Sequence, residues 1–159
     1  LFGPQASSIT NQHIILCPAR SEKWLSWLQD VLTEGGALLV ETTPERHDEL
    51  MSVVQGLNHM NTIMMGMALS KTTGALSHLD QFTTPFFEAK ATMVEKVLTG
   101  NPRLYAEIIC NNPNIAKIVE IYEQIISEIR YPILSGDAKE LTDMMEKTAA
   151  RLWPPENGR

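Results

Sequence analysis

The sequence lacks an excess of basic residues and holds only two cysteines, and each shortage excludes a class of function. Its 159 residues include 13 Lys and Arg against 19 Asp and Glu, for a formal net charge of −6. No nucleic-acid or anionic-membrane partner is expected, because no basic stripe is present to neutralise phosphates. Cys17 and Cys110 lie far apart, with no Cys or His at metal-ligand spacing. Neither a disulfide framework nor a metal site is therefore predicted.

Long hydrophobic runs and a signal sequence are missing as well. No apolar run reaches the ~18 residues that a membrane span needs, because Gln55, Asn58 and His59 interrupt the most apolar region. The chain opens at Leu1 rather than at Met and shows no cationic signal-peptide start, so we expect a fragment of a longer protein. With no sign of disulfides, these features predict a cytoplasmic protein.

The first 42 residues follow a different pattern from the rest. "HIILCPA" and "GALLVETT" are short β-type runs, and "SEKWLSWLQDVLTEGG" between them has the spacing of an amphipathic helix. Strand, helix and strand in this order predict a parallel βαβ element. Such elements normally belong to a larger sheet, so we expect the remaining strands to precede Leu1.

Residues from 43 onward are predicted to be helical throughout, which makes the fold class mostly α. Four Thr-Pro or Asn-Pro pairs offer a capping side chain followed by Pro at the first helical position. These pairs are Thr43-Pro44, Thr84-Pro85, Asn101-Pro102 and Asn112-Pro113, and Asp137 is a further cap candidate. "NIAKIVEIYEQIISEI" carries an apolar seam for helix packing at Ile115, Ile118, Tyr122, Ile125 and Ile129.

One helical stretch, "VQGLNHMNTIMMGMALS", has no charged residue, since none occurs between Glu49 and Lys71. At 3.6 residues per turn its polar positions fall on one narrow stripe of an otherwise apolar surface. The stripe comprises Asp48, Ser52, Gln55, His59, Thr62, Gly66 and Ser70. Two interpretations remain open from the residues alone. The stripe either hydrogen-bonds to neighbouring helices or lines the pocket of a polar ligand.

Two other candidate residues belong to no recognisable motif. Lys96 falls on the side of its helix opposite an apolar seam, which is typical of a solvated lysine, and Tyr105 is more typical of a core residue. No Ser-His-Asp order, glycine-rich phosphate loop or supported carboxylate pair is present.

Several motifs, taken in order, resemble the prephenate dehydrogenase family. They are "LFGP", "HIILCPAR", "GALLVETTPERHDELMSVVQGLNHM" and "TTPFFEAKATMVEKVLTGNPRLYAEIICNNPN". The resemblance implies that residues 1–42 end a Rossmann-type dinucleotide-binding domain. Residues 43–159 would form an all-helical dimerisation domain of about five helices, joining two copies as a homodimer. It also implies oxidative decarboxylation of prephenate to 4-hydroxyphenylpyruvate in tyrosine biosynthesis.

The resemblance places the central chemistry outside this chain. The family's catalytic His would lie just before Leu1, so no catalytic residue is expected here. NAD or NADP would bind the full-length enzyme through an upstream glycine-rich loop, and neither is expected to bind this fragment tightly. Gly3 and Pro4 would belong to an active-site loop.

By the same resemblance, four residues belong to the substrate site. His59 matches the family's second histidine at the pocket, Gln55 the glutamine before it and Tyr105 a nearby aromatic position. Lys96 matches an arginine that holds a prephenate carboxylate; lysine keeps the charge and loses the bidentate fork. Glu88 stands where relatives often carry another arginine.

The departures at Lys96 and Glu88 favour an alternative function slightly. In that alternative the chain is a helical dimerisation or small-molecule regulatory module, for instance one that senses tyrosine, without catalysis. A third possibility is the helical domain of another dehydrogenase of the same plan, which "LFGP" and "QGLNH" together disfavour.

Overall fold

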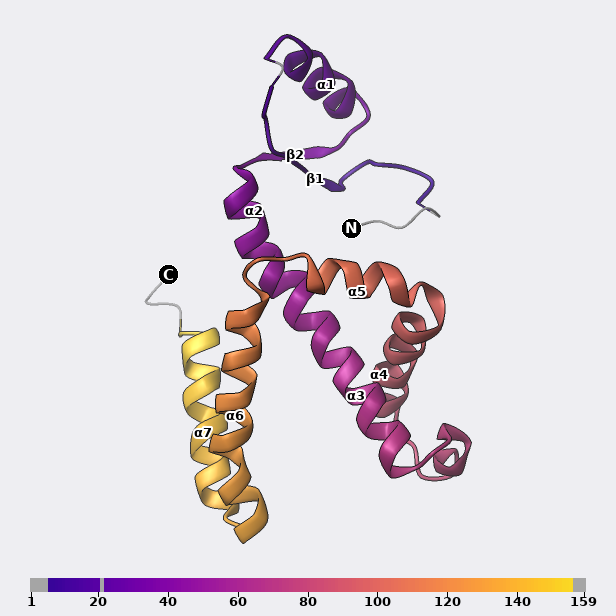
Figure 1. The fold of residues 1–159 in the computed structure, drawn as a ribbon, viewed down its shortest axis with the longest axis vertical. Helices are drawn as coiled ribbons and strands as arrows, with labels where there is room; N and C mark the ends of the chain where they lie inside the picture. The colour runs from indigo at the N-terminus through magenta and orange to yellow at the C-terminus, as the bar shows by residue number, and fades with distance from the viewer. Residues whose placement is uncertain (1–5, 21, 156–159) are drawn as a thin grey trace. The chain divides into compact units, whose positions relative to one another are not determined.

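The computed structural model describes residues 6–20 and 22–155, and it divides into two compact units, Leu1–Ile115 and Ala116–Arg159 (Figure 1). The first unit begins with the predicted βαβ element. It consists of β1 (His13–Leu16), α1 (Glu22–Glu34) and β2 (Leu38–Glu41). The two strands pair in parallel, and the register sets His13 opposite Leu38 and Leu16 opposite Glu41. Gly36, with a φ of 81°, turns the chain from α1 into β2.

A long helical stretch follows and includes the uncharged region. It is built from α2 (Pro44–Met51), the π-helical turn η1 (Ser52–Leu57) and α3 (Asn58–Thr72). Thr43 caps its start, since the Thr43 hydroxyl accepts a hydrogen bond from the Arg46 N–H. The π-helical turn inserts extra backbone into the α-helical ladder, so the side chains on either side change their relative direction.

The rest of the first unit folds back along α3. A short turn, η2 (Leu76–Leu79), leads to α4 (Pro85–Glu95), whose end continues as a second π-helical turn, η3 (Lys96–Gly100), before α5 (Pro102–Cys110). Helices α3 and α4 meet closely at Gly66. A Cβ added there would lie 2.6 Å from Leu98 Cδ1 and 2.9 Å from Val94 Cγ1. The missing side chain of Gly66 therefore sets the spacing of these helices.

The second unit is a hairpin of α6 (Ile115–Ser135) and α7 (Ala138–Leu152) (Figure 1). Gly136, with a φ of 72°, makes the turn, and the Asp137 side chain accepts from the Glu140 N–H to cap α7. On the predicted seam of α6, Ile118 is only 6% exposed, and Tyr122 and Ile129 are half-buried.

The predicted fold class is confirmed: a parallel βαβ element precedes five helical stretches within the described chain. Four cap predictions are confirmed, at Thr43, Thr84, Asn101 and Asp137. The prediction for Asn112-Pro113 is wrong, because α6 begins only at Ile115. There the Asn112 side chain accepts from the Asn114 N–H and closes a turn before the helix. Over the described residues, no helix combines the length and apolar character needed to cross a membrane.

Candidate functional site

The structure brings together two of the predicted site residues, His59 on α3 and Tyr105 on α5. Their ring centroids are 4.8 Å apart and the ring planes meet at 62°, an edge-to-face arrangement. Both side chains are half-buried. The pair joins the uncharged helix to the segment "NPRLYAE", so the site depends on a contact between helices remote in sequence.

His59 has an unusual polar environment. Its Nδ1 is the one buried side-chain nitrogen or oxygen among the described residues that has no hydrogen-bond partner. Desolvation lowers the pKa of His59 below its ordinary value of 6.5, so the neutral imidazole predominates near neutral pH. We assign the proton of that neutral ring to Nε2, because a buried N–H without a partner is rarer in proteins than a buried acceptor without one.

Two π-helical turns adjoin this pair. The turn η1 ends immediately before α3 and contains Gln55, and η3 begins with Lys96. Helix α5, which carries Tyr105, packs against both turns. Single π-helical turns inside α-helices occur frequently at functional sites, where they redirect side chains. Their position here is an observation independent of residue type that favours a site in this region.

Some side chains of the polar stripe predicted along the uncharged helix have hydrogen-bond partners within the protein, and others have none. Ser52 is buried and donates to the carbonyl of Glu49, and Thr62 donates to the carbonyl of Asn58. These two hydroxyls need no ligand, as the packing interpretation predicted. The side chains of Gln55, His59 and Ser70 form no hydrogen bond within the described part of the chain. Ser70 is exposed, so Gln55 and His59 are the half-buried polar groups of the stripe left for a ligand.

The remaining predicted residues are less closely associated with the pair. Lys96 is exposed, and no ion pair or hydrogen bond reaches its Nζ from residues 6–20 or 22–155. Gly3 and Pro4 lie outside the described residues. No group of three potential metal ligands occurs within the residues that the structure covers.

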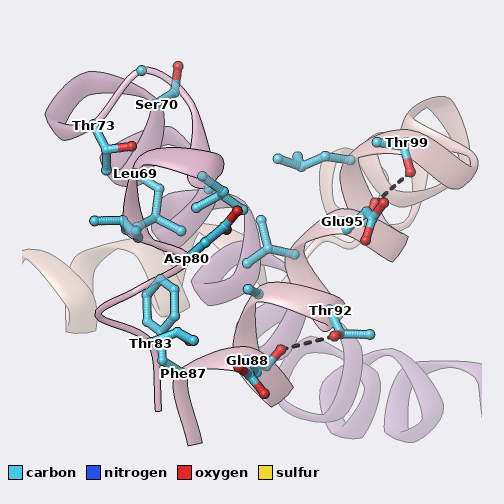
Figure 2. Close-up of a pocket in the computed structure, with 17 residues that line it drawn as sticks. Leu69, Ser70, Thr73, Asp80, Thr83, Phe87, Glu88, Thr92, Glu95 and Thr99 are labelled. Carbon is cyan, nitrogen blue, oxygen red and sulfur yellow. Dashed lines mark hydrogen bonds between the residues drawn. The ribbon is translucent and has the colours of Figure 1, made fainter. Parts of the chain in front are cut away.

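A groove lies elsewhere, between the end of α3, η2 and α4 (Figure 2). Its volume is about 750 Å³, and its lining includes Leu69, Phe87, Asp80, Glu88 and Glu95. No Lys, Arg or His lines it. Because three carboxylates and no cation face this groove, it is poorly suited to an anionic ligand. The groove had no sequence signature, since its walls come from three separate segments.

One positioning contact was also missed from the sequence. The Asn112 side-chain amide donates to the carbonyl of Asp48 over 2.8 Å and so ties the loop after α5 to the end of α2. The sequence indicated Asn112 only as a helix cap. A long-range bond of this kind leaves no local pattern, because Asn serves both roles equally well.

The family model and the relatives that match this sequence agree on one family. Residues 43–147 match the family model described as "Prephenate dehydrogenase, dimerization domain". A probable arogenate/prephenate dehydrogenase of Methanocaldococcus jannaschii is 30% identical over 94% of this chain and 34% of its own length. The T-protein of Enterobacter agglomerans is 26% identical over 86% of this chain and 37% of its own length. The chain thus spans about a third of these relatives.

Solved structures share the fold. The prephenate dehydrogenase of A. aeolicus, in complex with hydroxyphenyl propionate and NAD+, superposes with a TM-score of 0.70 at 21% identity, covering 89% of this chain and 49% of that one. Synechocystis arogenate dehydrogenase superposes with a TM-score of 0.66 at 20% identity, covering 90% of this chain and 52% of that one. Since the family model covers more than half of the residues, the chain belongs to the prephenate dehydrogenase family.

Proposed function

We propose that this chain is the C-terminal part of a prephenate dehydrogenase that oxidatively decarboxylates prephenate to 4-hydroxyphenylpyruvate with NAD or NADP. The chain supplies one wall of the substrate pocket and the dimer interface. Family membership and the names of the matched relatives support the reaction class. The observation that carries the site is the unpartnered imidazole of His59 beside Tyr105.

In this proposal His59 acts as a neutral hydrogen-bond donor. The Nε2–H makes no hydrogen bond within the described chain, and it offers one donor to a substrate carboxylate or carbonyl. Gln55, in the π-helical turn before α3, is proposed to offer an amide N–H to the same ligand. Tyr105 holds the imidazole plane through its edge-to-face contact. A hydrogen bond to a charged group contributes roughly 1.5–3 kcal/mol, which suffices to orient a small anion.

Lys96 is proposed as the cation of the site. Prephenate carries two carboxylates, and burying either one requires an opposite charge. An ammonium group attracts a carboxylate as a point charge and does not impose the bidentate geometry of arginine. We therefore expect Lys96 to contribute to affinity more than to orientation. The side chain is exposed and free to move toward a ligand.

The nicotinamide cofactor would accept the hydride that leaves the substrate ring. This chain is not suited to hold its pyrophosphate, because the turn after β1, "CPAR", contains no glycine that would let backbone approach a phosphate. We propose that residues 1–42 are the end of the cofactor domain and 43–159 the helical domain. The family model, which begins at residue 43, supports this boundary.

The helical domain is proposed to form a homodimer in the cytoplasm, with prephenate as its substrate and tyrosine as a candidate feedback ligand. Exposed apolar side chains support an interface. Large examples on the helices are Met67, Met93, Ile126, Ile133, Leu134 and Leu152. Surfaces of this kind normally pack against a partner.

The reaction is tested with the full-length protein, by following reduction of NAD and of NADP in the presence of prephenate or arogenate. We expect substrate-dependent reduction and release of carbon dioxide. The fragment of 159 residues serves as control and is expected to show no turnover and no saturable NAD binding by calorimetry. A full-length protein that binds tyrosine but reduces neither cofactor would instead favour the regulatory alternative.

A further inference from the structure

Helix α6 carries a second apolar stripe beside the seam predicted from its sequence. Val119, Ile126 and Ile133 are spaced seven residues apart, and residues at this spacing lie almost along one line of a helix. Their exposed fractions are 40%, 49% and 55%; on the seam, Ile118 is 6% exposed and Ile125 44%. A regular exposed line of branched apolar residues is the pattern of a helix that packs against another helix.

Two opposite charges flank the middle of this stripe. Glu123 precedes Ile126 by three residues, and Arg130 follows it by four. At 100° per residue both project to the same side of the stripe. Both side chains are exposed, and neither takes part in an ion pair within the part of the chain that the structure describes.

This arrangement is complementary to itself in one orientation only. If a second α6 runs antiparallel with a two-fold axis at Ile126, Val119 of one copy faces Ile133 of the other, because each lies about 10.5 Å from the axis. Glu123 of each copy then approaches Arg130 of the other. A parallel two-fold pairing would instead place these charges of the two copies on opposite sides of the interface, so that neither Glu123 would meet an Arg130.

We propose that the two-fold axis of the dimer passes between the α6 helices of two copies at Ile126, with Val119 against Ile133 and Glu123 against Arg130 across the axis. The inference rests on the homodimer of the proposed function and specifies where its copies meet. A second copy of this chain is the occupant that the stripe fits, since the apolar residues are spaced evenly about Ile126 and charges of opposite sign lie on its two sides.

Charge reversal in the full-length protein tests the ion pairs. Glu123→Arg and Arg130→Glu each create like-charge contacts and should raise the dimer dissociation constant roughly tenfold at low salt. The double swap, and an equimolar mixture of the two single variants, should restore dimerisation. Sedimentation velocity gives the constants, and circular dichroism checks the helices. Glu128→Arg, on another face of α6, is the matched control. A dimer unaffected by either reversal, or a mixture that stays dissociated, would overturn the pairing.

Cross-linking locates the axis itself. In a full-length background with Cys17→Ser and Cys110→Ser, Ile126→Cys should form a disulfide-linked dimer under mild oxidation, and Gln124→Cys, on the opposite side of α6, should not. A protein that sediments as a dimer without cross-linking through position 126 refutes this inference and leaves the proposed function intact. A wild-type protein that is monomeric at micromolar concentration refutes the proposed homodimer as well.

Discussion

The imidazole of His59 lies edge-to-face against the ring of Tyr105, with the centroids 4.8 Å apart. The contact joins α3 to α5 and excludes water from one side of a titratable group. Nδ1 of His59 is buried without a partner, and desolvation lowers the pKa of this residue. A neutral imidazole held in this way suits the hydrogen-bond donation that we propose for His59 more than general-acid chemistry.

Removing the ring of Tyr105 should raise the pKa of His59 toward 6.5, because water then reaches the imidazole. Tyr105→Leu is the informative variant, and Tyr105→Phe is its control, since phenylalanine keeps the ring and loses only the hydroxyl. NMR titration of the His59 imidazole measures the change. Equal pKa values in wild type and Tyr105→Leu would show that other groups desolvate His59.

Stability should depend on pH through His59. Its folded-state pKa is lower than its unfolded value of 6.5, so the unfolded chain binds more protons below that pH. The contribution of neutral His59 is fully present above pH 6.5 and is lost as pH falls toward the lowered folded-state pKa. Melting temperatures measured between pH 5 and 8 should therefore decrease less steeply toward acid pH for His59→Gln than for wild type. Parallel curves of melting temperature against pH for the two proteins would contradict the burial of the His59 imidazole.

The sequence was sufficient for features that depend on neighbours along the chain. Thr43 and Thr84 cap their helices as predicted, because the capping bond reaches only three residues ahead. The order strand, helix, strand likewise allowed the parallel pairing of β1 and β2 to be predicted.

Features set by packing could not be predicted. The stripe from Asp48 to Ser70 was drawn at 3.6 residues per turn, but η1 interrupts that period. At Gly56 within η1, an added Cβ would lie 2.8 Å from Ile115 Cδ1. The backbone of η1 therefore packs directly against the side chain of a residue that is remote in sequence. The contact between His59 and Tyr105 also joins separate helices, and only the family resemblance singled out both residues beforehand.

Replacing Lys96 with Met should raise the KM for prephenate roughly tenfold and change kcat little, because the lost attraction acts on bound substrate and transition state alike. Lys96→Arg should keep substrate affinity. Lys90→Met, on α4 just before η3, is the matched control; the Lys90 ammonium lies 4.8 Å from the centre of the Phe86 ring. Steady-state kinetics of the full-length variants decide the matter. An unchanged KM in Lys96→Met would remove this residue from the site.

Gly66→Ala should destabilise the helical domain by about 1–3 kcal/mol, because the new methyl group overlaps Leu98 and Val94. Gly100→Ala is the control, since an added Cβ there meets nothing within 4 Å. Urea unfolding followed by circular dichroism gives both free energies. Similar values for the two variants would mean that α3 and α4 move apart at little cost.

His59→Ala is the decisive substitution, because the two interpretations of the uncharged helix predict opposite results. If the imidazole donates a hydrogen bond to the substrate that persists in the transition state, its loss should lower kcat/KM of the full-length enzyme by roughly ten- to a hundredfold. The melting temperature should then fall only by what the lost ring contact with Tyr105 contributes, since Nδ1 has no hydrogen-bond partner to lose. His78→Ala, on the exposed turn η2, controls for histidine loss elsewhere. If His59 only packs against Tyr105, the variant should instead melt earlier and keep near-normal kinetics in its folded fraction.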